Sequence, residues 1–125
     1  MPSRSKNNTV MLDLRHLHRV SFGDGVLKLM PTATNLSVNQ APAGVSYVLP
    51  GGDCPTVAMG GQLSGGGFGY VGKCFGLTLA SLVEATVVTG DGSIVTASRE
   101  HNRDLKLKIR STGPVGGLPF ALGIK

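Results

Sequence analysis

Apolar and polar side chains alternate along much of this chain, a pattern of period two that is typical of strands with one buried face. Residues 19–30 and 82–97 each predict a β-hairpin. In the first, Asp24-Gly25 supplies the positive φ of a tight turn, and in the second the stretches LVEATVV and SIVTA flank the turn TGDG. In all, strands are predicted at residues 9–14, 19–22, 26–30, 45–49, 82–88, 93–97 and 120–124.

Helical signals are fewer than strand signals. Thr34 is a suitable N-cap for a short helix. The helix is expected to end at about Gln40, because the residue ahead of Pro42 avoids the helical region. Residues 100–109 are ambiguous: their apolar residues alternate with lysines as on a half-exposed strand, whereas Asn102 could cap a helix. The local period favours the strand. Residues 113–117, rich in glycine and proline, are expected to form a loop.

Composition changes the picture at the surface. The 125 residues, 41% of them hydrophobic, suit one compact domain with a modest core. Only 15% are charged, against about 25% in an average soluble domain, so part of the surface is expected to meet a partner, a cofactor or further chain. The net charge of +5 could attract nucleic acid, but the basic residues are scattered and stacking platforms are scarce, with no Trp and two Tyr. No nucleic-acid partner is expected.

No membrane partner is expected either, since no apolar run approaches the roughly 20 residues that cross a bilayer.

Glycine accounts for ten of the 26 residues from Gly51 to Gly76. Large apolar residues are interspersed with these glycines, which a flexible linker would not carry. Gly67, Gly69 and Gly72 match the spacing G-x-G-x-x-G, but the strand and helix of a Rossmann site are not evident around them. Two interpretations stay open at this point: close approach of bare backbone to a flat ligand, or a structural turn packed under other chain.

The residues around this stretch carry a family resemblance. The segment CPTVAMGGQLSGGGFG, residues 54–69, resembles the C-P-T-V-G-x-G-G-H-x-x-G-G-G-x-G segment of flavin oxidases of the berberine bridge enzyme and glucooligosaccharide oxidase type. Residues 75–105 are similar to a second family segment that ends in S-x-x-x-N-x-D-L, and residues 9–15 to its V-x-I-D-L strand. The resemblance implies a PCMH-type FAD-binding domain of the vanillyl-alcohol oxidase superfamily. Its fold class would be α+β, with mixed and antiparallel strands and a few short helices.

The resemblance also implies a cofactor, FAD, and residues that bind it. In the family, the cysteine that matches Cys54 forms a thioether to carbon C6 of the isoalloxazine ring, in addition to a histidyl link. A thiolate is the competent nucleophile for such a bond. The alternative for Cys54 is a small buried hydrophobe. The implied cofactor-binding residues are Cys54, Pro55, Thr56, Val57, Gly60, Gly61, Gln62, Ser64, Gly65, Gly66, Gly69 and Val87.

Several positions depart from the family pattern. Ala58 stands where the family commonly has Gly, and Gln62 where it commonly has a His near the flavin ribityl chain. Gln can donate and accept hydrogen bonds but cannot carry a proton-linked charge. Lys106 replaces a core aromatic, and burying it unpaired would cost several kcal/mol, so different or incomplete packing is expected there. Cys74 falls where the family usually has a basic residue, and is interpreted as structural.

The resemblance further implies that residues 1–125 form only part of the FAD-binding domain. The family's R-S-G-G-H pyrophosphate loop would precede residue 1, and its substrate domain would follow Lys125. The expected function is the FAD-binding portion of an oxidoreductase that oxidises a sugar or alcohol by hydride transfer to flavin, with dioxygen as acceptor. The alternative is a non-catalytic fragment or small basic interaction module without bound flavin.

Overall fold

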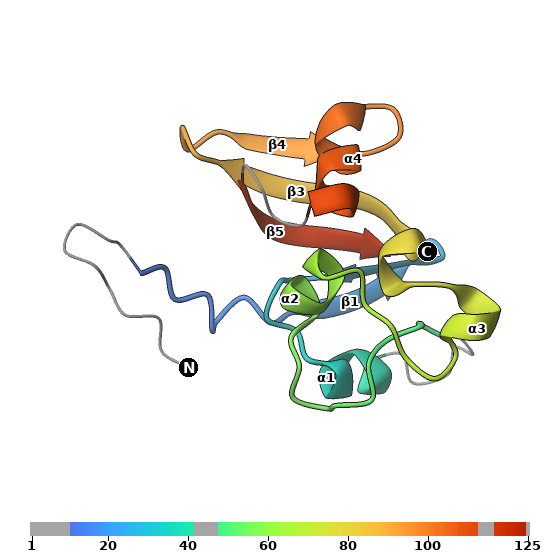
Figure 1. Ribbon diagram of the computed structural model, residues 1–125. Helices are drawn as coiled ribbons and strands as arrows, with labels where there is room; N and C mark the ends of the chain where they lie inside the picture. The colour runs from blue at the N-terminus through green and yellow to red at the C-terminus, as the bar shows by residue number, and fades with distance from the viewer. Residues whose placement is uncertain (1–10, 42–47, 113–116, 125) are drawn as a thin grey trace.

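One β-sheet brings together two hairpins that lie far apart in the sequence (Figure 1). The computed structural model describes residues 11–41, 48–112 and 117–124. The strands pair in the order β1-β2-β5-β3-β4, and every pair among these residues is antiparallel. The sheet consists of β1 (Val20–Gly23), β2 (Val26–Leu29), β3 (Leu82–Thr89), β4 (Ile94–Ala97) and β5 (Gly117–Ile124).

Short helices accompany this sheet, as the α+β class predicts. They are α1 (Asn35–Gln40), α2 (Met59–Ser64), α3 (Gly72–Phe75), α4 (Arg103–Thr112) and the 3-10 helix η1 (Thr78–Ser81). Within the described part of the chain, no helix is both long and apolar enough to cross a membrane. The sequence did not predict α2, since helix propensity is low in a stretch with two adjacent glycines.

Both predicted hairpins are confirmed, because each is specified by residues close together in the sequence. The strand predicted at residues 120–124 is confirmed as the second half of β5. β5 inserts between the hairpins: Leu122 lies opposite Leu29 of β2 and opposite Ala85 of β3. The C-terminal strand therefore joins two locally determined units into one sheet.

The hydrophobic core lies where the helices pack against the sheet, with α2 and α4 on the same side of it (Figure 1). Removing apolar side chains from water is the main favourable contribution to folding. α1 contributes Val38, and α2 contributes Met59 and Leu63. The full cluster is Leu27, Leu29, Ala33, Val38, Met59, Leu63, Leu79, Leu82, Ala85, Val87, Ala97, Ile109 and Ile124.

The helix predicted from Thr34 is confirmed as α1. Thr34 has extended backbone angles (φ −89°, ψ 160°), and its side chain accepts a hydrogen bond from the backbone N–H of Ser37. The Ser37 hydroxyl in turn accepts from the backbone N–H of Thr34, at 2.9 Å. This reciprocal capping box satisfies donors that a helix start would otherwise leave unpaired. It fixes the end of α1 that faces the candidate site described below.

Replacing Thr34 with alanine is expected to lower the free energy of unfolding by about 1 kcal/mol, because the N-cap acceptor is lost. Urea denaturation followed by circular dichroism measures the change. Thr34→Ser keeps the hydroxyl and should retain most of the stability. Equal midpoints for the Thr34→Ala and wild-type chains would contradict this role for the cap.

The strand favoured for residues 100–109 is wrong: the chain forms helix α4 from Arg103. Leu105 and Ile109, four residues apart, both pack on the core, so tertiary contact selects the helical period over the alternating one. Asn102 does not cap the helix through its side chain, whose Nδ2 instead donates to the carbonyl of Thr96 at 2.8 Å.

Lys106 in α4 is buried, with 4% of its surface exposed. Its Nζ donates to the backbone carbonyl of Val83 at 2.9 Å. The packing therefore differs from that of an aromatic residue: the lysine side chain reaches a backbone carbonyl of β3. This hydrogen bond offsets part of the cost of removing the ammonium group from water.

Two other predicted strands are not seen in the described residues. Residues 11–14 of the first have no strand pairing, and residues 9–10 lie outside the described range. Met11 and Leu12 are 71% and 64% exposed, and without a neighbouring strand an alternating segment has nothing to pair with. Residues 48–49 of the strand predicted at 45–49 are not strand, and 45–47 lie outside the described residues.

The remaining expectations concern a loop and the type of sheet. Of the loop predicted at residues 113–117, Gly117 already belongs to β5, and residues 113–116 lie outside the described range. The parallel pairing that a mixed sheet would contain does not occur among the described strands. A Rossmann site at the glycines would require parallel strands, and the described residues contain no parallel strand pair.

Candidate functional site

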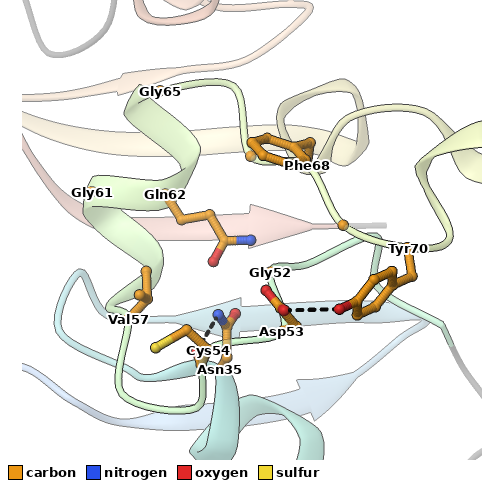
Figure 2. A pocket seen from close by; sticks show the side chains of 12 residues that line it. Asn35, Gly52, Asp53, Cys54, Val57, Gly61, Gln62, Gly65, Phe68 and Tyr70 are labelled. Atoms are coloured by element: carbon orange, nitrogen blue, oxygen red, sulfur yellow. Dashed lines mark hydrogen bonds between the residues drawn. The ribbon is translucent and has the colours of Figure 1, made fainter.

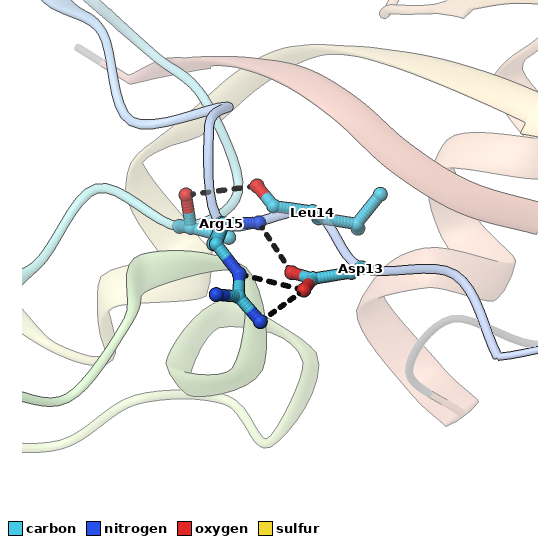
Figure 3. Close-up of polar contacts among 4 residues, drawn as sticks. Asp13, Leu14 and Arg15 are labelled. Atoms are coloured by element: carbon cyan, nitrogen blue, oxygen red, sulfur yellow. Dashed lines mark hydrogen bonds and ion pairs between the residues drawn. The ribbon is translucent and has the colours of Figure 1, made fainter.

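A surface cleft of about 620 Å³ opens between α2 and two glycine-rich segments, residues 51–54 and 65–70 (Figure 2). This size is within the range of small-molecule and cofactor sites, roughly 300–1,000 Å³. Five glycines and two aromatic residues contribute to its walls. The lining residues are Asn35, Gly52, Asp53, Cys54, Val57, Gly61, Gln62, Gly65, Gly67, Phe68, Gly69 and Tyr70.

The turn that carries Cys54 is held by the first residues of α1. The side-chain Nδ2 of Asn35 donates to the carbonyl of Cys54 at 3.0 Å, and the Asn35 backbone N–H donates to the carbonyl of Val57, also at 3.0 Å. The backbone N–H of Leu36 donates to the carbonyl of Pro55 at 3.1 Å. Asn35 is 4% exposed, so these bonds are shielded from water. The helix start therefore supplies its free donors to the turn instead of to solvent.

The Cys54 thiol is exposed, so its interpretation as a small buried hydrophobe is wrong. Its Sγ lies 3.6 Å from the Thr56 hydroxyl oxygen. The hydrogen bond with the Thr56 hydroxyl, followed by those with backbone N–H groups of Thr56 and Val57, lowers the pKa of the thiol below its ordinary value. The charge of Asp53 acts in the opposite sense and is weaker. The turn thus favours the thiolate, which is the nucleophilic form of cysteine.

Two adjacent glycines of α2 have different surroundings. A Cβ on Gly60 would lie 2.7 Å from the carbonyl oxygen of Pro31, so this glycine allows α2 to pack tightly against the chain that follows β2. A Cβ on Gly61 would meet nothing within 4 Å, and Gly61 lines the cleft. Gly60 therefore serves packing, as the structural interpretation of the glycine stretch predicts, and Gly61 leaves part of the cleft wall as bare backbone, as the ligand interpretation requires.

Gln62 presents an acceptor at the cleft wall. Its Nε2 donates to the Thr78 hydroxyl oxygen at 3.4 Å, and that hydroxyl donates its own proton to the carbonyl of Pro50. Because the Thr78 oxygen can then only accept, the Gln62 amide must turn its nitrogen toward it. The Oε1 atom of Gln62 is buried, and it has no hydrogen-bond partner among the described residues. A buried acceptor without a donor is costly, and a bound molecule with an N–H or O–H group would satisfy it.

Aromatic side chains stand at the rim of the cleft. Phe68 and Tyr70 are 79% and 88% exposed, an unusual position for large apolar rings in a small domain. The Tyr70 hydroxyl donates to the Asp53 carboxylate at 3.2 Å, so it links the loop after Gly69 to the residue before Cys54 (Figure 2). Exposed rings beside bare backbone suit a flat aromatic ligand, which stacks on the rings.

Comparison with known proteins decides the family. A family model described as "FAD binding domain" matches residues 2–98 of the chain. The chain belongs to this family of FAD-binding domains. A glucooligosaccharide oxidase from Sarocladium strictum is 39% identical over 111 residues, which cover 83% of this chain and 21% of that protein. FAD-linked oxidoreductase pynB from Aspergillus niger is 35% identical over 114 residues, covering 86% of this chain and 20% of that protein.

Solved structures of the same kind share the fold. The glucooligosaccharide oxidase of Acremonium strictum, whose flavin is a 6-S-cysteinyl, 8α-N1-histidyl FAD, matches with a TM-score of 0.75 and 31% identity. The match covers 92% of this chain and 25% of that one. This FAD-binding domain therefore spans about a fifth to a quarter of the length of these relatives.

The structure brings together six of the residues that the sequence assigned to FAD binding. Cys54 and Val57 come from the turn held by α1, and Gly61 and Gln62 come from α2. The cleft-lining residues of the predicted set are Cys54, Val57, Gly61, Gln62, Gly65 and Gly69. These residues fit a flavin: the cleft offers a nucleophilic sulfur, bare backbone, exposed rings and the acceptor of Gln62 that lacks a donor.

The other predicted residues lie outside the cleft lining. Pro55 and Thr56 form the turn beside Cys54, and Gly60 packs on Pro31. The Ser64 hydroxyl donates to the carbonyl of Gly60 at 2.7 Å, within α2. Gly66 has φ +93° in the turn after α2. Val87 is 1% exposed in the core, in strand β3. Cys74, interpreted as structural, is exposed in α3 and is not part of the hydrophobic core formed by the described residues.

Sequence reasoning missed six cleft residues: Asn35, Gly52, Asp53, Gly67, Phe68 and Tyr70. Phe68 and Tyr70 carried a usable signal, because large rings within a glycine run have little chain around them to bury them. Asn35 carried none. It lies 19 residues before Cys54, and only the folded turn brings the two together.

Proposed function

We propose that this chain supplies the flavin-holding surface of an FAD-dependent oxidoreductase, with the sulfur of Cys54 as a covalent attachment point for the ring. The observation that carries the proposal is an exposed thiol, hydrogen-bonded so as to favour the thiolate, at the edge of a cleft lined by glycines. The cysteinyl flavin of the Acremonium strictum oxidase supports it, since that protein shares this fold.

Each cleft element has a separate task in the proposed complex. Gly61 and Gly65 leave room for the ring to approach the backbone of α2, and Phe68 and Tyr70 cover its exposed side. Gln62 Oε1 accepts a hydrogen bond from the cofactor. Bound flavin would supply a two-electron acceptor: a substrate carbon would give up a hydride, the substrate hydroxyl would lose a proton, and dioxygen would take the two electrons and two protons to become hydrogen peroxide.

A sugar or alcohol is the proposed substrate class of the whole enzyme. The support is the similarity to a glucooligosaccharide oxidase, of whose length this chain covers 21%. An open cleft also agrees with covalent attachment, because a tethered cofactor is retained without being buried.

Replacing Gly61 with leucine tests the binding surface. Gly61 lines the cleft, and nothing lies within 4 Å of a Cβ at this position, so there is room for a larger side chain, which would take up space in the cleft. We expect the affinity for FAD to fall about tenfold or more, equivalent to at least about 1.4 kcal/mol, with no loss of thermal stability. Titration of the full chain with FAD, followed by flavin fluorescence, measures the affinity.

Gly72→Leu is the matched control. Gly72 also has open space around its Cβ position, and it lies outside the cleft lining. The Gly72→Leu chain should bind FAD with the affinity of the wild-type chain. If the wild-type chain binds no FAD at all, the alternative of a domain without bound flavin is favoured. Equal affinities for the Gly61→Leu and Gly72→Leu chains would place the flavin elsewhere.

A further inference from the structure

Thr56 lies beside the cleft and does not line it, yet its side chain turns back toward the sulfur of Cys54. The Oγ1 atom of Thr56 is 3.6 Å from Cys54 Sγ. A hydroxyl that donates to a sulfur stabilises the sulfur's negative charge, because a hydrogen bond to a charged partner is stronger than one to a neutral partner. The same hydroxyl offers little to the neutral thiol, which is a weak acceptor.

The backbone around the two side chains is held in place. The carbonyls of Cys54, Pro55 and Val57 each accept a hydrogen bond from the first residues of α1. The Val57 N–H also donates to the Cys54 carbonyl, at 3.4 Å. With both ends of the turn anchored, the backbone that carries the two side chains is already ordered, so less conformational entropy is lost when the hydroxyl bonds to the sulfur.

We propose that Thr56 is a positioning residue for flavin attachment: its hydroxyl holds Cys54 Sγ in the orientation and ionisation state needed to bond to the ring. The inference rests on the proposed function of Cys54. When the thiol ionises, its proton leaves to solvent and the Thr56 O–H donates to the remaining thiolate. Attachment would replace the C–H bond of ring carbon C6 by a C–S bond, and the two electrons and two protons released would pass to dioxygen, which becomes hydrogen peroxide. Thr56 itself neither gains nor loses a proton.

The charges around Cys54 do not replace this role. Asp53 is the charged neighbour that acts on the thiol, and its charge raises the thiol pKa. The elements that pack beside the turn present Asn35 from α1 and Gln62 from α2, and neither of these side chains ionises. The hydroxyl of Thr56 is the largest influence on the thiol and lowers its pKa.

The test compares Thr56→Val, which removes the hydroxyl at similar volume, with Thr56→Ser, which keeps it. The full chain, isolated free of flavin, is alkylated with iodoacetamide across a range of pH. The reaction forms a sulfur–carbon bond and releases iodide, and it proceeds through the thiolate. Trypsin cleavage after Lys73 separates Cys54 from Cys74, so mass spectrometry follows both rates in one sample.

We expect Thr56→Val to slow alkylation of Cys54 near neutral pH by about two- to fivefold, and to move the rise of its pH profile to higher pH. Cys74, exposed and in α3, is the internal control and should react unchanged. Thr56→Ser should restore the wild-type profile. A merely structural role of Thr56 could change the rate of alkylation but would leave the rise of the Cys54 pH profile in place, because that rise follows the pKa of the thiol.

Identical pH profiles for the Thr56→Val and wild-type chains would overturn the inference. The outcome is separable from that of the proposed function, because attachment is measured separately, as flavin that stays with the polypeptide after acid precipitation. A slowed Thr56→Val chain, together with a wild-type chain that never retains flavin, would support the Thr56–Cys54 pairing and overturn the attachment.

Discussion

Replacing Cys54 with alanine is expected to remove all acid-stable flavin from the chain. The sulfur of Cys54 is the attachment atom proposed here, and alanine keeps the backbone whose carbonyl Asn35 holds. Non-covalent binding should persist, since the glycines and rings of the cleft are unchanged. The measurement is flavin absorbance in the polypeptide pellet after acid precipitation of the chain produced or incubated with FAD.

Cys74→Ala is the control for this experiment. Cys74 is also exposed and free, but it is not among the residues of the cleft. The Cys74→Ala chain should keep its flavin in the pellet, as the wild-type chain does. Flavin that stays with the Cys54→Ala chain at the wild-type level would show attachment through another residue.

Replacing Gly69 with alanine is expected to be strongly destabilising. A Cβ at this position would overlap the carbonyl group of Gly51, because the two glycine-rich segments of the cleft cross there backbone against backbone. Relief requires the crossing chains to separate, at a cost of about 2–3 kcal/mol in the free energy of unfolding. Urea denaturation followed by circular dichroism measures the change in the free energy of unfolding.

Gly61→Ala is the matched comparison, because the same methyl group is added to another cleft glycine. It meets no atom within 4 Å and lies inside α2, so a gain of about 0.5–1 kcal/mol is expected from helix propensity. A Gly69→Ala chain as stable as the Gly61→Ala chain would show that the crossing of the two segments can relax without cost.

The candidate site was predictable to the extent that its residues are consecutive. The segment from Cys54 to Gly69 contains most of the predicted cleft residues, because one turn and one helix present them together. Val87 shows the limit of this reasoning. It lies on a strand whose apolar alternation was read correctly, but the structure places its side chain in the core. Asn35 shows the converse, since no local pattern marks an asparagine as the support of a turn 19 residues away.

The sequence alone determined the hairpins and the capped helix α1. In each, the deciding groups lie within a few residues of one another, so little loop-closure entropy opposes their contact. The sequence also determined the family, through the segment of residues 54–69 that resembles the family's motif.

The tertiary structure alone decided three other features. Residues 103–109 became helical because Leu105 and Ile109 both reach the core with a helical period. β5 takes the central place in the sheet by pairing with β2 and β3, and both of these strands lie far from it in the sequence. Gly60 and Gly61 differ in role because Pro31 lies against one and open space against the other. These features depend on contacts between distant segments, and such contacts leave no periodic trace in the chain itself.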